Sequence, residues 1–323
     1  MKAAVIYERG DMPQCVDFPE PVVQNEDELL ISVKAAAIKH FDKGRASGKH
    51  YSANTDNKNA TVIGGDGVGV LQDGTRVFAL GVSGMIAEKA TIEKSRMVTL
   101  PDGIEDAVAA ALPNAVAGSA MALRFRADMK PGETILINGA TGFTGKIAVQ
   151  VAKHYGAKKI IVTGRNEQSL QSLIALGANE IVSVKQDDEK FISQLKEIHN
   201  NTSIDIIIDY LWGHTAELIL ASLKGKGAFT HKTRFVSIGA VTGDKIQLSA
   251  ENLRSVDLHL SGSGLGSWTK EEMKKLFTEI IPEMFQLAAD KKLKVETVNV
   301  NLKDIEKLWD MEVPDGKRLV VTM

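Results

Sequence analysis

The spacing of hydrophobic and polar residues changes near residue 100 of the chain. Up to that point, short apolar and β-branched runs are interrupted by glycine, aspartate and proline, which is typical of strands joined by turns. The runs are Met1–Tyr7, Leu29–Ala37, Val68–Leu71 and Arg76–Leu80. This pattern predicts a small β-rich unit in the first part of the chain.

Alanine-rich segments follow Pro101 and Asp102. They favour two helices, Glu105–Leu112 and Gly118–Arg126, because alanine has the highest intrinsic helix propensity. Asp102 is a candidate N-cap for the first helix, since a short polar side chain there accepts hydrogen bonds from free backbone N–H groups. We interpret these helices as the bridge between two domains.

Apolar strands and helical segments alternate from Glu133 to about Gly243. Near-continuous apolar strands that alternate with helices are typical of a parallel sheet covered on both faces. The sequence therefore predicts a doubly wound α/β unit. Its predicted strands are Thr134–Asn138, Lys159–Thr163, Glu180–Val184, Ile204–Tyr210 and Phe235–Gly239.

The last part of the chain predicts a return to the β-rich unit. It has an amphipathic helical pattern from Thr269 to about Leu293, a strand Val295–Asn301, a short helix and a terminal strand Arg318–Met323. A chain of 323 residues is long enough for two domains. We place a β-rich domain at 1–115, an α/β domain at 116–265 and the returning segment at 266–323.

Composition and charge argue against nucleic acid and membranes as partners. A formal net charge of −2 provides no overall positive field for nucleic acid or an anionic membrane surface. We find no run of about 20 uninterrupted apolar residues that predicts a membrane span. The single cysteine, Cys15, excludes an intrachain disulfide. The opening run is short for a signal peptide, so we expect a cytoplasmic protein without nucleic-acid or membrane partners.

A glycine-rich turn between a predicted strand and a predicted helix is the strongest motif. Gly142 would let the backbone approach a pyrophosphate, and Gly145 would let the helix pack on the sheet. The helix N-terminus would then face the diphosphate with free N–H donors. This context predicts a Rossmann dinucleotide site, and the alternative is a tight turn of a flavodoxin-like domain without a dinucleotide. The candidate ligands in the turn are Ala140, Thr141, Gly142, Phe143, Thr144 and Gly145.

The end of the second α/β strand bears on the choice between NAD and NADP. A site selective for NAD usually has Asp or Glu here to bind the ribose hydroxyls, but the chain has Gly164, Arg165 and Asn166. A guanidinium suits a 2′-phosphate, so we predict NADP(H). The alternative is that Arg165 is a solvated surface residue.

Later strand ends add candidate cofactor residues, because ligands of doubly wound sheets bind at the carboxyl edge. Tyr210, Gly239 and Ala240 follow the fourth and fifth strands and are expected on the nicotinamide side. Ser263 lies in a glycine-rich run that is either in contact with the cofactor or a flexible turn. Asn114 is either a ligand of the nicotinamide half or a helix cap.

Several segments together resemble the zinc-free, quinone oxidoreductase-like branch of the medium-chain dehydrogenase/reductase superfamily, over nearly the whole chain. The resemblance implies a GroES-like β-rich substrate domain with a Rossmann domain. The branch usually has A-x-G-x-x-G in the cofactor turn, which Ala140, Gly142 and Gly145 match. The other segments are Met1–Tyr7, Val62–Val70, Gly74–Val77, Leu100–Gly103, Lys130–Gly145, Leu176–Ala178 and Gly316–Val321.

The resemblance also argues against a metal centre. Zinc members of the superfamily have a cysteine and a histidine where this chain resembles them at Lys39 and Gly65. Neither residue replaces a thiolate or an imidazole, and the four-cysteine lobe of the structural zinc is absent from the sequence. We therefore expect no zinc and no zinc-dependent alcohol dehydrogenase mechanism.

The chemistry that the resemblance implies is reduction of a quinone or an α,β-unsaturated carbonyl by NADPH. Tyr51 is a candidate proton or hydrogen-bond donor, and Lys39 or His40 would stabilise developing negative charge. Structural alternatives are that Tyr51 anchors a loop, Lys39 is exposed, His40 packs or caps locally, and Asp42 bonds a backbone N–H. Lys39 and Gly44 also depart from the branch's common Asn and Tyr.

Two other functions stay open at this point. The chain is either an enzyme or an NADP-binding sensor or structural protein without turnover. An enoyl reductase that acts on a carrier-bound polyketide would use the same site. We expect a homodimer, because two-fold dimers are the commonest closed assemblies and relatives often join sheet edges.

Overall fold

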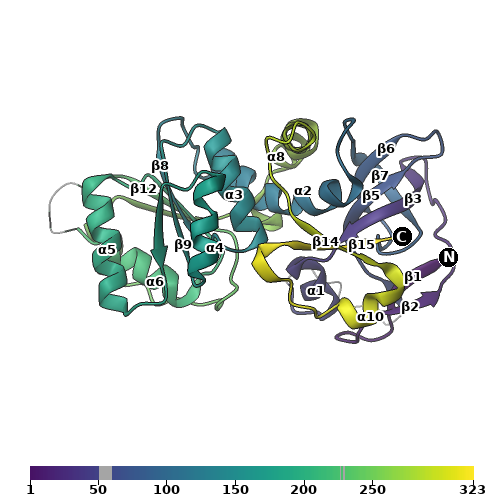
Figure 1. Ribbon diagram of the computed structural model, residues 1–323, viewed down its shortest axis with the longest axis horizontal. Helices are drawn as coiled ribbons and strands as arrows, with labels where there is room; N and C mark the ends of the chain where they lie inside the picture. The colour runs from purple at the N-terminus through teal and green to yellow at the C-terminus, as the bar shows by residue number, and fades with distance from the viewer. Residues whose placement is uncertain (51–59, 226, 228–229) are drawn as a thin grey trace. The chain divides into compact units, whose positions relative to one another are not determined.

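Curled antiparallel strands form most of the N-terminal part of the chain. The computed structural model describes residues 1–50, 60–225, 227 and 230–323 (Figure 1). One sheet has the order β14-β15-β3-β5-β6-β7, and β3 also pairs with β7, which gives a barrel-like layer. A smaller sheet has the order β2-β1-β4. The bounds are β1 Lys2–Ile6, β2 Gln14–Asp17, β3 Glu28–Ala37, β4 Thr61–Val62, β5 Asp66–Val70, β6 Arg76–Gly81, β7 Lys89–Thr99, β14 Thr297–Asn301 and β15 Arg318–Thr322.

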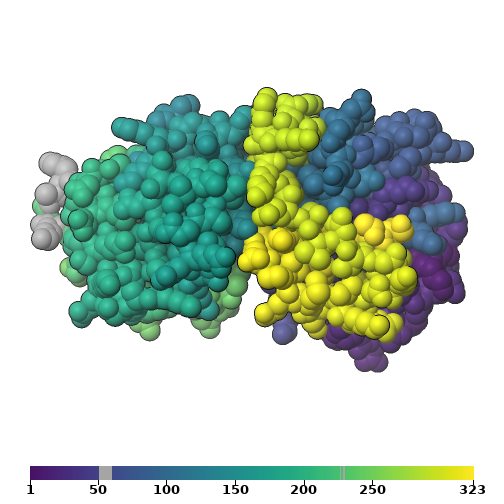
Figure 2. Space-filling model, in the orientation of Figure 1, coloured from purple at the N-terminus to yellow at the C-terminus, as the bar shows by residue number. Residues whose placement is uncertain are grey.

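The alternation of β3 explains how this sheet forms its core. Ile31, Val33 and Ala35 are buried, whereas the intervening Ser32 and Lys34 are exposed. Side chains that alternate in this way point to opposite faces of a strand. β15 pairs antiparallel with β3, so the C-terminal segment returns to this unit as expected. Figure 2 shows the C-terminal residues, in yellow, beside the N-terminal ones, in purple.

A six-stranded parallel sheet forms the centre of the second unit. Its order is β10-β9-β8-β11-β12-β13. The chain crosses from β10 on one edge to β11 in the other half, as in a doubly wound sheet. The sixth strand, β13, was not predicted. The bounds are β8 Thr134–Asn138, β9 Lys159–Gly164, β10 Glu180–Ser183, β11 Ile206–Asp209, β12 Thr233–Ser237 and β13 Leu258–Gly262.

Helices pack on this parallel sheet and bury its strands. Every residue of β8 and of β11 is buried, which explains why these runs are apolar without alternation. Leu136 of β8 and Ile207 of β11 share one core with Phe191 of α5 and Ala216 of α6. The helices of this unit are α3 Phe143–His154, α4 Glu167–Ser172, η2 Ile174–Leu176, α5 Asp188–Asn201, α6 Gly213–Ser222, α7 Ala250–Ser255 and η3 Leu265–Ser267.

The two helices predicted after residue 100 form one continuous helix. α2, Asp106–Met121, includes Pro113 and continues into the π-helical turn η1, Ala122–Arg126. The hydrogen bond from Ala109 N to Glu105 O belongs to its first turn, so the prediction of Asp102 as the N-cap was wrong. Residues 106–126 are long and apolar enough to cross a membrane, but 72% of an apolar 18-residue stretch within them is buried, as in a core helix.

The C-terminal amphipathic pattern also gives one continuous helical segment. It consists of α8, the π-helical turn η4 and α9. The chain divides into two units, Met1–Asn114 with Phe277–Met323 and Ala115–Leu276. The remaining helices are α1 His40–Ala46, α8 Lys270–Lys275, η4 Leu276–Ile280, α9 Ile281–Ala289, η5 Leu302–Asp304, α10 Ile305–Leu308 and η6 Pro314–Gly316.

Candidate functional site

The glycine turn follows β8 and leads into α3. Gly139 has φ +83°, a left-handed conformation that glycine adopts without strain. A Cβ on Gly145 would lie 2.5 Å from the Cα of Ala140, so only glycine allows the helix to approach the turn this closely. A Cβ on Gly142 would meet no protein atom within 4 Å. Gly142 therefore borders open space at the N-terminal end of α3, where an anion is favoured.

The turn after β9 lies against the glycine turn. A Cβ on Gly164 would come within 2.5 Å of the Thr141 Cγ2 atom, so the two turns are in close contact. The next side chain, Arg165, is exposed, and its guanidinium has no hydrogen bond or ion pair with any described residue. Asn166 uses its Oδ1 atom to accept a hydrogen bond from Ser169 N at 2.9 Å, which caps α4. Arg165 is thus a cation available to a ligand beside the turn.

The predicted residues of later strand ends differ in their surroundings. Tyr210 is buried, its hydroxyl donates to Gly118 O at 3.3 Å, and burial raises the pKa of this phenol. A Cβ on Gly239 would lie 2.6 Å from Tyr210 O, and Ala240 is exposed. These positions put the turns after β11 and β12 in contact at the carboxyl edge of the sheet.

Two further candidates have local structural partners. Ser263 follows β13 and is buried, and its hydroxyl accepts a hydrogen bond from Trp268 Nε1 at 3.0 Å. Asn114 lies inside α2, so the alternative that it caps a helix was wrong. Phe143 is buried in the first turn of α3, and Thr144 is half-buried beside it.

Sequence reasoning missed a buried polar group beneath these turns. It consists of Asn138, Thr163 and Asp209, at or next to the last positions of β8, β9 and β11. The signal was in the sequence, because each is a polar residue that ends an otherwise apolar strand. A buried polar side chain needs hydrogen-bond partners, so three of them at one sheet edge indicate a connected network.

A second polar cluster lies in the β-rich unit. Lys39 is only 1% exposed, so the alternative of an exposed lysine was wrong. Its Nζ atom lies 2.7 Å from Asp66 Oδ1, 3.0 Å from Asp42 Oδ2 and 3.1 Å from Ala37 O. Burial penalises the ammonium, but Asp42 and Asp66 outweigh this penalty and raise the pKa of Lys39. Three acceptors match the three N–H donors of an ammonium, which leaves none for a substrate in this geometry.

The neighbours of Lys39 complete the cluster. Asp42 accepts hydrogen bonds from the backbone N–H groups of Gly65, at 3.1 Å, and Lys39, at 3.0 Å, so the structural alternative for Asp42 is confirmed. Arg318 is 8% exposed, and burial lowers its pKa to about 10. His40 is exposed at the start of α1, and burial of part of the ring, then Arg318 and Lys43, lower its pKa. Tyr51 lies outside the described residues.

Comparisons with known proteins identify the family of this chain. Residues 144–281 match the family described as zinc-binding dehydrogenase. Quinone oxidoreductase 1 of Escherichia coli K12 is 30% identical over 319 residues, which cover 92% of this chain and 91% of the relative. Human quinone oxidoreductase is 26% identical over 286 residues, or 85% of this chain and 83% of the relative. The chain belongs to the quinone oxidoreductase-like branch of the medium-chain dehydrogenases/reductases.

Solved structures show the same fold over the whole chain. A mycobacterial quinone oxidoreductase has a TM-score of 0.85 at 22% identity, with 100% of both chains covered. The E. coli quinone oxidoreductase complexed with NADPH has a TM-score of 0.83 at 22% identity, again with 100% of both chains covered. The predicted fold class, a GroES-like domain together with a Rossmann domain, is confirmed. The name GroES-like domain refers to residues 1–114 and 277–323, and the name Rossmann domain refers to residues 115–276. As a member of this branch, the protein is an oxidoreductase.

The matched family is described as zinc-binding, but the described residues of this chain offer no suitable set of zinc ligands. In the part of the chain that the structure describes, no three His, Cys, Asp or Glu side chains are grouped to hold an ion. Two buried acidic residues, Asp42 and Asp66, share the Lys39 ammonium. A divalent cation between them would lie next to a buried positive charge, so these residues do not fit zinc.

Proposed function

We propose that this protein reduces quinones or α,β-unsaturated carbonyls with NADPH and without zinc. The observation that carries the proposal is the combination of the open glycine turn with the free guanidinium of Arg165 at the end of the neighbouring strand. The first would hold a pyrophosphate and the second a 2′-phosphate. The names of the similar proteins, quinone oxidoreductase 1 and a quinone oxidoreductase complexed with NADPH, support the same activity.

In this proposal the cofactor and the protein residues have separate roles in the reduction. The bound cofactor would supply the hydride, and the protein would bind, orient and desolvate the reactants. Hydride addition to a quinone or to the β-carbon of an enone leaves an oxyanion, which then takes a proton. His40 is exposed and, because its pKa is lowered, neutral near pH 7, so it would donate a hydrogen bond to that oxygen. Lys39 would act as a positioning residue, because its donors are already used.

Arg165→Ala tests the cofactor assignment. Loss of charge-assisted hydrogen bonds to a 2′-phosphate should raise the KM for NADPH roughly ten- to hundredfold and leave the KM for NADH unchanged. The measurement is coenzyme oxidation at saturating 1,4-benzoquinone or an enone such as methyl vinyl ketone. Arg254→Ala is the matched control, because Arg254 is also exposed in the Rossmann domain but lies on α7. If Arg165→Ala keeps the preference for NADPH, the 2′-phosphate assignment is wrong.

Two further arms of the same assay test the rest of the proposal. Prior dialysis against a strong chelator should leave the turnover of quinone unchanged, and a loss that zinc restores would contradict the zinc-free mechanism. The second candidate function, an NADP-binding sensor, predicts NADPH binding without oxidation by any quinone or enone. NADPH binding is measured separately by thermal shift, since a ligand of the native state raises the melting temperature.

A further inference from the structure

A chain of buried hydrogen bonds crosses three adjacent strands of the Rossmann domain. The Thr163 hydroxyl of β9 donates to Asn138 Oδ1 of β8 at 2.6 Å. Asn138 Nδ2 in turn donates to Asp209 Oδ1 of β11 at 2.7 Å. All three side chains are fully buried, and Asn138 and Asp209 are paired in the strand register. The network therefore connects three neighbouring strand ends at the edge where the glycine turn lies.

The carboxylate of Asp209 fixes the turn that follows β11. Its Oδ1 atom accepts hydrogen bonds from Leu211 N at 3.0 Å and Trp212 N at 3.2 Å, and its Oδ2 atom lies 3.0 Å from Trp212 N. On the other side of the turn, the Thr242 hydroxyl lies 3.0 Å from both Leu211 O and Trp212 O. The backbone between these two sets of contacts is held from both sides.

This turn has an unusual backbone. Trp212 has φ +57°, followed by Gly213 with φ +58°. A bulky residue with positive φ is an outlier that persists only where its surroundings over-determine it, and such residues cluster at functional sites. The contacts of Asp209 and Thr242 are the surroundings that hold Trp212 in this conformation.

The same network reaches the glycine turn. Thr163 Oγ1 accepts a hydrogen bond from Gly139 N at 3.2 Å, and Thr163 O accepts one from Ala140 N at 2.9 Å. Leu211 packs directly on Gly139, because a Cβ there would lie 2.8 Å from the Leu211 Cγ atom. The glycine turn and the turn at 210–213 are therefore set relative to each other by the Asp209 network.

We propose that Asp209 is a positioning residue, which through Asn138 holds the turn at 210–213 in place against the nicotinamide half of the cofactor. The inference rests on the proposed NADPH function. A dinucleotide lies across the strand ends of a doubly wound sheet, with its pyrophosphate at the helix after the glycine turn. With the adenosine half near Arg165 beyond β9, the other half would extend toward β11, which is the neighbour of β8 on the opposite side.

Asp209→Asn tests this role with two ligands. The asparagine keeps the size of the side chain but replaces one acceptor oxygen with an NH₂ donor. This NH₂ group faces either the Trp212 N–H or the donors of Asn138 and Leu211. One set of hydrogen bonds is therefore lost in either orientation. We expect the Kd for NADPH to rise roughly ten- to hundredfold. The Kd for adenosine 2′,5′-bisphosphate, which lacks the nicotinamide half, should stay within about twofold of that of the unaltered protein. Both constants are measured by isothermal titration calorimetry.

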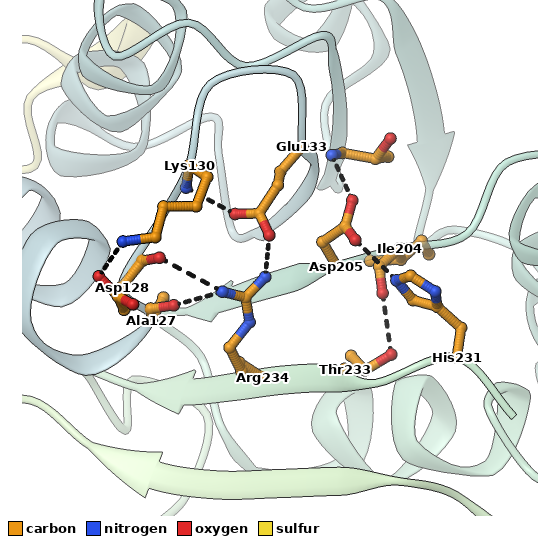
Figure 3. A network of polar contacts seen from close by, with 10 residues as sticks. Ala127, Asp128, Lys130, Glu133, Ile204, Asp205, His231, Thr233 and Arg234 are labelled. Carbon is orange, nitrogen blue, oxygen red and sulfur yellow. Dashed lines mark hydrogen bonds and ion pairs between the residues drawn. The ribbon is translucent and has the colours of Figure 1, made fainter.

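The chain offers a matched control at the other end of the same strand. Asp205 directly precedes β11 and is also a bonded carboxylate, which accepts from Thr134 N at 2.7 Å and lies 2.6 Å from His231 Nε2 (Figure 3). This cluster lies at the amino ends of the strands, away from the turns that would bind the cofactor. Asp205→Asn should therefore leave the Kd of both ligands within about twofold, whatever it does to stability.

A second pair of variants covers the case in which Asp209→Asn does not fold. Thr242 is exposed, so its substitution leaves the buried core intact. Thr242→Val removes the hydroxyl contacts to Leu211 O and Trp212 O and should weaken NADPH binding several-fold without affecting adenosine 2′,5′-bisphosphate. Thr242→Ser retains the hydroxyl and should restore the affinity for NADPH. A merely structural role would not separate the two ligands in this way.

The outcomes distinguish the inference from the function on which it rests. If the unaltered protein binds neither ligand, the proposed NADPH function fails. If the unaltered protein binds both ligands, the variants decide. The positioning role of Asp209 is overturned if Asp209→Asn, or the Thr242→Val variant, leaves both affinities unchanged. It is also overturned if the variant lowers both affinities by the same factor.

Discussion

Lys39 shows how a single residue can depart from the behaviour of its type. Lysine is almost never fully buried unless it is paired, and the sequence near Lys39 does not indicate two carboxylate partners. One partner, Asp42, is three residues away on α1, whereas Asp66 lies 27 residues further along the chain on β5. The pairing becomes visible only when the sheet brings the end of β3 next to the start of β5. Sequence alone identified the position but not its burial.

Lys39→Met should destabilise the GroES-like domain strongly. The substitution keeps most of the apolar stem but leaves Asp42 and Asp66 buried without their cation, which costs about 3–5 kcal/mol. The measurement is the free energy of unfolding from urea titration. Lys43→Met is the matched control, because Lys43 makes one partly exposed ion pair at 3.7 Å and should cost less than about 1 kcal/mol.

A double variant separates charge from packing at this position. Lys39→Met combined with Asp66→Asn removes one of the uncompensated carboxylates, so it should recover part of the stability that Lys39→Met loses. Equal losses for the single and double variants would mean that packing of the lysine stem, and not its charge, accounts for the effect.

At the scale of elements, the buried apolar strands were predictable from the sequence. The polar edge strand and the continuation of a helix through proline were not. The five predicted strands of the parallel sheet exist because continuous apolar runs fit positions buried on both faces. β13 was missed because it contains His259, Ser261 and Gly262 and is exposed at the edge of the sheet. The helices predicted at Glu105–Leu112 and Gly118–Arg126 are one helix, because α2 continues through Pro113. The helix lies in a core, where tertiary packing overrides local propensity.

The candidate site was predictable only where its parts are consecutive in the sequence. The glycine turn has a local signature, since its strand, glycines and helix are consecutive in sequence, and the structure has all three. The Asp209 network has no local signature, because its members are separated by 25 and 71 residues. Such contacts depend on strand order, which a single sequence does not specify.

The junction between α5 and β11 should make stability depend on pH. His199 Nδ1 accepts a hydrogen bond from Ile204 N at 3.1 Å, so this nitrogen must be unprotonated. Burial, then the neighbouring His231, lower the pKa of His199, and Asp205 opposes them. A histidine whose pKa is lowered in the folded state stabilises the fold above its unfolded value and loses this contribution as pH falls.

Acidification from pH 7.5 to 5.5 should therefore lower the melting temperature through His199. The contribution is less than about 1 kcal/mol, because the imidazole is partly exposed and screened by solvent. His199→Asn retains an acceptor for Ile204 N that does not titrate in this range, so its melting temperature should fall less over the same interval. Identical pH profiles for the two proteins, measured by differential scanning calorimetry, would contradict this role of His199.

At the scale of the whole molecule, the two units explain why residues of one function are distant in sequence. The cofactor turns and Arg165 belong to the Rossmann domain, whereas Lys39 and His40 belong to the GroES-like domain. The sequence predicted the units and the C-terminal return because each has its own hydrophobic pattern. Association between copies has no such pattern in the sequence, because it depends on which surface the folded chain exposes.

We propose that two copies associate through β13, one of the two outer strands of the parallel sheet. Among the described strands, β13 pairs only with β12, so its other edge offers unpaired backbone N–H and C=O groups. Leu260 on this strand is 38% exposed. Two-fold antiparallel pairing of β13 with its copy would satisfy the free edge and bury Leu260 twice, since a C2 interface uses the same patch on both subunits. Light scattering after size exclusion should then give twice the chain mass of 34.9 kDa.

Leu260→Lys should convert this dimer to a monomer at micromolar concentration. A charge on an edge strand is a common device against strand association, and here it would be placed twice at one two-fold interface. Leu253→Lys is the matched control, because Leu253 is 49% exposed but lies on α7, and this variant should remain dimeric. A monomeric unaltered protein would refute the assembly itself. A Leu260→Lys variant that stays dimeric while folded would place the interface elsewhere than β13.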